Sequence, residues 1–119
     1  MISRYTRDDM GRIWTQENRL QKMLEVEVAV AAVQAEMKII PQRAAKAIAQ
    51  RARFDAKRIA VIEQTTKHDV IAFVTNVAEN IGEEGRFLHF GLTSSDVLDT
   101  AFSLQVQEGG RELLRSLEH

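Results

Sequence analysis

Apolar residues recur at intervals of three and four along most of the chain, and no stretch shows the alternation of a half-buried strand. This spacing predicts amphipathic helices. The longest expected helix covers about residues 16–38. Its two adjacent apolar faces carry Leu20, Leu24, Glu27, Ala31 and Ala35 on one side and Met23, Val26, Val30, Val33 and Met37 on the other. An apolar surface of that width predicts burial against more than one neighbouring element.

Capping residues mark where the other helices are expected to begin. A threonine followed three residues later by an acidic residue is a capping box, because the two side chains satisfy N–H groups that a helix start leaves unpaired. Pro41 suits the first position of a helix, and Asp55 suits the N-cap of the next one. The expected boxes are Thr6 with Asp9, Thr66 with Asp69, and Thr93 with Asp96.

Together these signals predict an all-α fold of about six helices with no sheet. Besides 16–38, the expected helices lie at about 8–14, 41–52, 55–64, 66–82 and 93–117. Gly82 is expected to close the fifth, and Gly109–Gly110 weakens the prediction for the sixth. We expect one helical domain over residues 1–117, ending at the start of a further helical bundle, and interpret residues 118–119 as an expression-tag remnant.

Composition and charge narrow the functional classes. The 119 residues suit one domain or a piece of a larger protein. A net charge of −1, from 16 basic and 17 acidic residues, supplies no basic surface for nucleic acid or an anionic membrane. The chain has no cysteine, so disulfides and thiolate metal sites are excluded. It also has no apolar stretch long enough to span a bilayer. This composition fits a cytoplasmic protein.

Two short stretches gather reactive side chains just before a helix: TTKHDV at 65–70 and HFGLTSSDV at 89–97. A helix N-terminus carries free N–H groups and a partial positive charge, so it suits a phosphate or carboxylate. In the first stretch His68 can donate a hydrogen bond and Lys67 adds a charge. In the second, Gly91 permits close backbone approach beside several hydroxyl groups. Two such starts that meet in space would hold a dianionic substrate.

The same residues also have a purely structural interpretation. A Thr-x-x-Asp pattern is far more often a cap than a site, and Ser94–Ser95 is an ordinary pair at a helix start. His68, His89 and His119 lack the i,i+4 partners typical of a metal-binding helix, so we expect no metal site. The local chemistry leaves both interpretations, capping and anion binding, open.

Four segments taken together resemble a known family. They are RY at 4–5, IWTQENRLQKMLEVEVAV at 13–30, FDAKRIAVIEQTTKHDVIAF at 54–73 and RFLHFGLTSSDVLDTA at 86–101. The motif T-x-HDV followed by H-x-GLTSSDV-x-DT resembles the fumarase/aspartase superfamily and, within it, the adenylosuccinate lyase family. The resemblance runs in order to about Leu117 and implies the N-terminal helical domain of that fold.

The resemblance also implies an activity. The family releases fumarate by β-elimination from adenylosuccinate, leaving AMP, and from the succinylated carboxamide ribotide in purine biosynthesis. A base removes a proton next to a carboxylate, and an acid protonates the departing nitrogen. The resemblance implies a small-molecule nucleotide substrate, no cofactor, no nucleic acid or membrane partner, and a homotetramer whose sites are assembled from several subunits.

Substrate contact is assigned, by resemblance, to residues from three parts of the chain. Arg4 and Tyr5 would contact the nucleotide, and His68 would assist catalysis as a hydrogen-bond donor to the substrate. Lys67 stands where relatives often have arginine, which keeps the charge but loses bidentate bonding. The full set is Arg4, Tyr5, Lys67, His68, Asp69, Thr93 and Ser94, and His89 matches a further family histidine near the site.

The chain stops far short of the family's length. It lacks the long bundle that builds the tetramer core, the histidine assigned as general acid or base, and the glycine- and serine-rich loop with the catalytic serine. We therefore expect the substrate-binding, N-terminal part of the enzyme, inactive by itself. The alternative is a non-catalytic helical interaction module sharing the fold. The joint presence of Arg4, Tyr5, His68, Thr93 and Ser94 favours the enzyme.

Overall fold

The computed structural model describes residues 2–119. Over that range the chain forms six α-helices and three short 3₁₀ segments, with no strand. The α-helices are α1 (Asp8–Gly11), α2 (Gln16–Glu36), α3 (Gln42–Arg51), α4 (Ala56–Thr66), α5 (Asp69–Ile81) and α6 (Ser94–Glu118). The 3₁₀ segments are η1 (Ser3–Tyr5), η2 (Arg12–Trp14) and η3 (Glu83–Phe87). The predicted all-α class is confirmed for this part of the chain.

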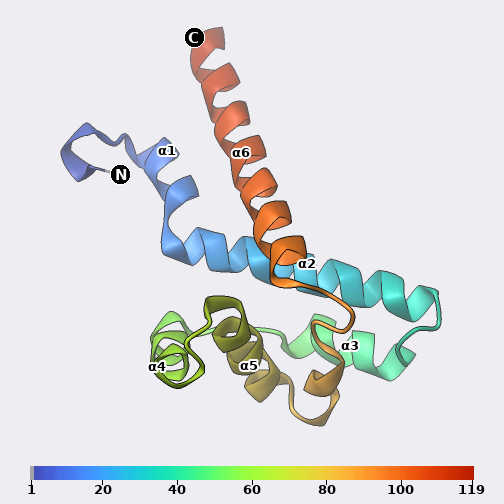
Figure 1. The fold of residues 1–119 in the computed structure, drawn as a ribbon. Helices are drawn as coiled ribbons and strands as arrows, with labels where there is room; N and C mark the ends of the chain where they lie inside the picture. The colour runs from blue at the N-terminus through green and yellow to red at the C-terminus, as the bar shows by residue number, and fades with distance from the viewer. Residues whose placement is uncertain (1) are drawn as a thin grey trace.

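The other elements are arranged around α2. Helices α3, α4 and α5 gather along one side of α2, while α6 crosses α2 and projects away from them (Figure 1). The segment from η1 to η2 lies beside the projecting part of α6, so both termini lie on the side of α2 opposite to α3–α5 (Figure 1). The helix starts of α5 and α6 are thereby kept near the middle of the molecule.

One buried cluster joins α2, α3 and α5 and also includes residues of α4 and α6. Met23, Ile48 and Phe73, from α2, α3 and α5 respectively, are each at most 1% exposed. Burying a side chain of this size stabilises the fold by about 1.5–3 kcal/mol. The second predicted apolar face of α2 is only partly covered, because Val33 and Met37 are 52% and 65% exposed. The expectation that neighbours bury both faces of α2 is therefore wrong at its C-terminal end.

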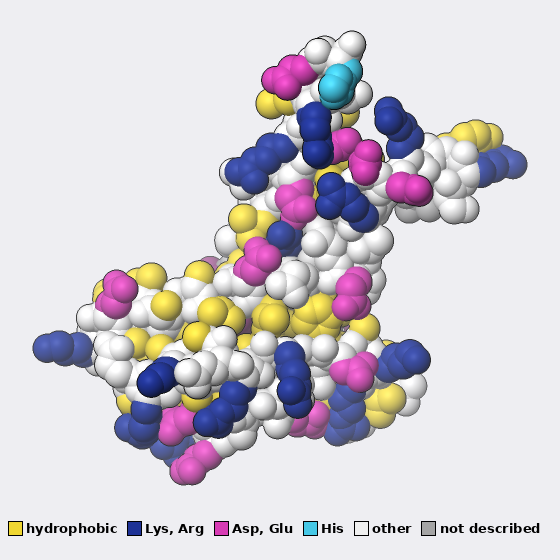
Figure 2. All heavy atoms as spheres, turned by 180° about the vertical axis from the view of Figure 1, so that it is seen from behind, with side chains coloured by type: hydrophobic (Ala, Val, Ile, Leu, Met, Phe, Trp, Pro, Cys, Tyr) yellow, Lys and Arg dark blue, Asp and Glu magenta, His cyan; other side chains and the backbone are white. Residues whose placement is uncertain are grey.

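The surface has no single sign of charge on the face shown in Figure 2. Acidic and basic side chains are interspersed there, and apolar side chains gather along the middle of the molecule (Figure 2). This face therefore offers no continuous basic patch of the kind that binds nucleic acid.

Of the three predicted capping boxes, one forms. The N–H group of Thr93 donates to Asp96 Oδ2 at 2.8 Å, as a capping box requires. The prediction at Thr6 is wrong, because its hydroxyl donates to a backbone carbonyl four residues earlier and α1 starts without a side-chain cap. The prediction at Thr66 is also wrong. Thr66 is the last residue of α4, and His68 caps α5 instead.

The predicted starts of α3 and α4 are correct to within one residue. Asp55 caps α4, since its Oδ1 accepts from the N–H groups of Lys57 and Arg58 at 2.9 and 3.2 Å. Pro41 is the N-cap of α3 and not its first residue, because its ψ of 147° is extended. Its fixed φ of −65° still prepares the chain for the helix that follows.

Helix α6 runs without a break through Gly109–Gly110, so the expected weakness there is not seen. Gly109 is buried, and a Cβ atom at this position would lie 3.4 Å from the Trp14 ring. The ring of Trp14 also packs against Phe102, with centroids 6.1 Å apart. The glycine therefore serves close packing of α6 against η2, and that packing offsets its low helix propensity of about 1 kcal/mol.

A partly buried ion pair joins α2 to α6. Lys22 Nζ lies 2.7 Å from Glu108 Oε1, and their side chains are 16% and 27% exposed. The hydrogen bond to Lys22 is the main cause that lowers the pKa of Glu108, and the same bond raises the pKa of Lys22. A carboxyl group whose folded-state pKa is lowered stabilises the fold above its unfolded pKa, which is about 4.3.

We expect Glu108→Gln to lower the free energy of unfolding at pH 7 by about 1 kcal/mol, the upper end for such pairs, because both partners are partly buried. The difference in free energy of unfolding between the variant and wild type should persist from near-neutral pH up to the pH at which Lys22 loses its proton. It should disappear as the pH falls through the folded-state pKa of Glu108. Urea unfolding at a series of pH values measures this. Glu118→Gln, exposed on the same helix, is the control, and equal stabilities at pH 7 would contradict the expectation.

Candidate functional site

The structure brings together the two stretches that the sequence singled out. Helices α5 and α6 begin side by side, and His68 Nε2 lies 3.4 Å from Ser94 Oγ although the two residues are 26 positions apart. Both residues are partly buried, so the pair lies at the protein surface and not inside the hydrophobic core. The starts of α5 and α6, both with polar side chains, therefore lie next to each other.

The ring of His68 is oriented by its role as the N-cap of α5. Its Nδ1 accepts a hydrogen bond from the N–H group of Ile71 at 3.2 Å. A ring nitrogen that accepts carries no proton, so the neutral ring holds its proton on Nε2, which faces Ser94. The His68 side chain is 41% exposed. The cap thus sets a donor at the surface, so capping and ligand binding are compatible at this residue.

Lys67 and Asp69 lie on either side of this histidine and have different surroundings. Lys67 adopts the left-handed conformation (φ 55°, ψ 25°), which costs about 1–2 kcal/mol for a residue with a side chain. This turn closes α4 and redirects the chain into α5, and it leaves the Lys67 side chain exposed. Asp69 Oδ2 lies 3.5 Å from Arg19 Nη2, so this carboxylate links α5 to α2.

At the start of α6 the two hydroxyl-bearing residues have separate roles. The N–H and the hydroxyl of Thr93 both donate to Asp96 Oδ2, at 2.8 and 3.0 Å. These bonds, the backbone one first, lower the pKa of Asp96. The Thr93 hydroxyl is therefore used by the capping box, whereas the Ser94 hydroxyl faces His68. Of the two, Ser94 is the better placed to contact a ligand.

The turn before α6 is tethered to α2 at two points. His89 Nδ1 lies 2.5 Å from Glu27 Oε1, and Gln34 Nε2 donates to the carbonyl of Phe90 at 2.7 Å. His89 and Gly91 have positive φ values of 62° and 72°. A left-handed histidine is uncommon, so the surrounding contacts must hold it. These tethers place the turn that leads into Thr93.

Glu27 was not predicted as a functional residue. Its side chain is 1% exposed, and burial raises the pKa of its carboxyl while the His89 hydrogen bond opposes that rise. The periodicity of α2 correctly placed it on the buried face. An acidic residue at such a position is itself a signal, because a buried carboxylate requires a partner.

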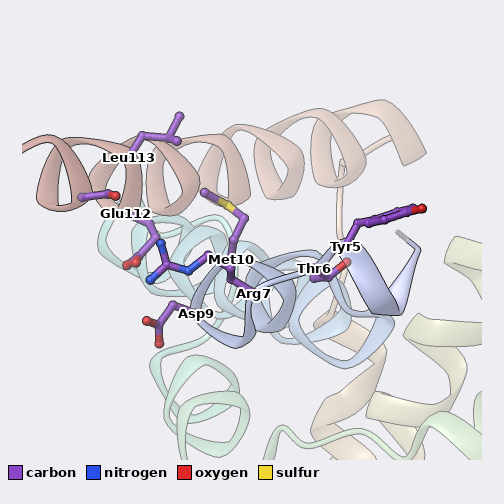
Figure 3. A pocket seen from close by; sticks show the side chains of 8 residues that line it. Tyr5, Thr6, Arg7, Asp9, Met10, Glu112 and Leu113 are labelled. Atoms are coloured by element: carbon purple, nitrogen blue, oxygen red, sulfur yellow. The ribbon is translucent and has the colours of Figure 1, made fainter.

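Arg4 and Tyr5 lie at the other end of α6. Tyr5 lines a pocket of about 270 Å³ between the N-terminal segment and α6, where Met10 extends toward Leu113 (Figure 3). The Arg4 guanidinium carbon lies 4.8 Å from the centre of the Tyr5 ring, which is 73% exposed. The 19 steps from Ser94 to Leu113 correspond to about 28 Å along the helix axis. Within one chain these residues do not meet His68.

Within residues 2–119 there is no group of three or more histidine, cysteine or carboxylate side chains arranged to hold a metal ion. In the same part of the chain, every helix is too short or too polar to cross a membrane. The candidate site also contains two carboxylates, but Asp69 is paired with Arg19 and Asp96 accepts from Thr93. The hydroxyl, imidazole, ammonium and backbone N–H groups at the two helix starts suit an anion.

Three similar curated proteins are named adenylosuccinate lyase. The chain is 52% identical over 118 residues to adenylosuccinate lyase of Synechocystis sp., 47% identical to that of Bacillus subtilis, and 45% identical to that of Aquifex aeolicus over 121 residues. Each alignment covers 99% of this chain. The chain spans 27–28% of the length of these relatives.

Two solved structures have a similar fold. A fumarate lyase from Mesorhizobium sp. BNC1 matches 93% of the chain with a TM-score of 0.82, and a β-carboxy-cis,cis-muconate cycloisomerase from Acinetobacter calcoaceticus matches 89% with 0.75. Both are 30% identical to this chain, which covers 27% of each. The lyase family matches residues 3–119. With that match over nearly its whole length, the chain belongs to the lyase family.

Proposed function

We propose that this chain is the N-terminal, substrate-binding part of an adenylosuccinate lyase. The whole enzyme would release fumarate by β-elimination from adenylosuccinate, giving AMP, and from the succinylated carboxamide ribotide in purine biosynthesis. The names of the relatives support this, and so does the share of their length that the chain spans. The structural observation that carries the proposal is the approach of His68 Nε2 to Ser94 Oγ at the start of α6.

The pair supplies the hydrogen bonds that such a reaction needs. In β-elimination a base removes a proton beside a carboxylate, the C–N bond breaks, and the nitrogen takes up a proton as fumarate leaves. Negative charge builds up on the carboxylate beside the carbon that loses its proton. Donors already aimed at that charge stabilise the transition state. The Ser94 hydroxyl, the His68 Nε2–H group and the first N–H groups of α6 are such donors, and Lys67, the residue before His68, carries a positive charge.

In this proposal His68 assists, and the principal acid and base come from other parts of the protein. Arg4 and Tyr5 contact the nucleotide in a site of another subunit. The separation of about 28 Å along α6 supports assembly from several copies, as in a homotetramer. Exposed apolar side chains along α6 support subunit contact as well, since such a stripe favours association. They are Phe102, Val106, Leu113, Leu114 and Leu117.

Ser94→Ala in the full-length enzyme tests the proposal. We expect kcat/KM for adenylosuccinate to fall about tenfold or more, because a hydrogen bond to a charged group is worth about 1.5–3 kcal/mol. Stability should change little, since the capping box of Thr93 and Asp96 stays intact. Fumarate release and thermal unfolding measure the two effects. Ser95→Ala is the matched control, because Ser95 is exposed one position along the same helix.

Two outcomes count against this assignment. If Ser94→Ala lowers the melting temperature markedly while the folded enzyme keeps its kcat/KM, the hydroxyl is only structural. If the wild-type full-length protein releases no fumarate from either substrate, the proposed activity is wrong, and a non-catalytic helical interaction module is the remaining interpretation.

A further inference from the structure

The Glu27 carboxylate is buried in a way that core packing does not explain. It lies on α2 among apolar neighbours, with 1% of its surface exposed. One oxygen contacts His89 Nδ1 at 2.5 Å, and the other, Oε2, has no hydrogen-bond partner within residues 2–119. A buried carboxylate with half of its bonding capacity unused is costly to keep. An apolar residue would pack at this position at lower cost. We therefore attribute the presence of the carboxylate to its contact with His89.

The contact determines which nitrogen of His89 can face a ligand. In its ionised form the Glu27 carboxylate only accepts hydrogen bonds, and its His89 partner then holds a proton on Nδ1. In the neutral ring the other nitrogen, Nε2, then has a free lone pair and is directed away from Glu27. The His89 side chain is 21% exposed, so part of it reaches the surface.

His68 has the opposite arrangement. Its Nδ1 accepts from the backbone, which leaves a proton on Nε2. The two histidines flank the start of α6, one across from Ser94 and the other five residues before it in the chain. One therefore presents a donor and the other an acceptor, and a different element of the fold sets each of these states.

We propose that Glu27 is a positioning residue that orients His89 as a hydrogen-bond acceptor for the substrate and holds the turn before α6 in its left-handed form. This role rests on the proposed lyase function. The ligand group it selects is a donor, such as a hydroxyl or N–H group of the nucleotide, while Ser94 and His68 hold the carboxylate. Gln34, which donates to the next carbonyl in the turn, supports the same segment from about two helix turns further along α2.

The state of the ring can be measured without activity. In the protein labelled with ¹⁵N-histidine, NMR should show His89 with its proton on Nδ1, and that proton should resonate at low field because it is shared with a carboxylate at short distance. Glu27→Gln should move or abolish this signal, and Glu36→Gln, an exposed change on the same helix, should leave it unchanged. A wild-type His89 protonated only on Nε2, or an unchanged signal in Glu27→Gln, would overturn the proposal.

The effect on catalysis is measured by a double-mutant cycle in the full-length enzyme. Glu27→Gln should lower kcat/KM for adenylosuccinate by about tenfold to a hundredfold, the range for a misplaced binding group. Its melting temperature should stay the same or rise, because glutamine keeps the shape and removes a buried charge. In an enzyme that already carries His89→Ala, the same change should cost less than about twofold, since Glu27 acts through His89.

Two kinetic results contradict the role. Glu27→Gln that keeps wild-type kcat/KM shows that the carboxylate is dispensable, and effects that multiply independently in the double variant show that Glu27 does not act through His89. A wild-type enzyme that releases no fumarate overturns the proposed function alone, because the NMR signal still decides whether Glu27 orients the ring.

Discussion

The 119-residue chain alone is expected to release no measurable fumarate from adenylosuccinate. In the proposed mechanism the principal acid and base lie in other parts of the enzyme, and general acid–base catalysis is worth about 10²–10⁴-fold. The groups that the chain does carry are divided between two places. Arg4 and Tyr5 lie about 28 Å along α6 from Ser94, so one copy cannot surround a nucleotide with both sets.

The measurement compares fumarate release by the purified chain and by the full-length enzyme at equal concentration. Circular dichroism of the purified chain is the control, because a helical spectrum shows that inactivity does not result from unfolding. Turnover by the pure chain near the full-length rate would contradict the expectation. It would also show that residues 1–119 hold the complete acid–base machinery.

His68→Ala in the full-length enzyme should lower kcat far more than a surface change such as Glu118→Ala, by about tenfold to a hundredfold, because a hydrogen bond to a charged group is worth about 1.5–3 kcal/mol. Alanine removes the Nε2–H donor that faces Ser94. It also removes the cap of α5, which costs about 0.5–2 kcal/mol of stability. The variant thus changes both catalysis and folding.

A second substitution separates the two effects of this change. Asparagine is among the best N-cap residues, so His68→Asn should keep the start of α5 and restore much of the lost stability. It cannot reproduce the imidazole, so kcat should remain low. Near-normal kcat and KM in both variants, measured by steady-state fumarate release, would show that His68 is a cap and nothing more.

Sequence patterns alone determined most of the helices and part of the core. The three-and-four spacing of apolar residues placed α2 within two residues of its observed end, and Asp55 and Gly82 marked real helix boundaries. These features depend on contacts between residues close in the chain, and the residues themselves therefore carry the signal. The capping box of Thr93 and Asp96 formed for the same reason.

The paired motifs also indicated which helix starts to examine. The stretches at 65–70 and 89–97 do lie beside each other, through the contact of His68 with Ser94. The family resemblance supplied the expectation that Arg4, Tyr5 and His89 belong to a site. It carried no information on which of these residues meet within a single chain.

Only the tertiary structure decided how each polar side chain is used. Thr66 fitted a capping box in the sequence, but it ends α4, and His68 takes the cap. Glu27 looked like a member of a buried face, and its partner His89 lies 62 residues away. A side chain with several available partners takes the one that packing brings within reach. That packing depends on residues far apart in sequence, whereas capping patterns and periodicity report only near neighbours.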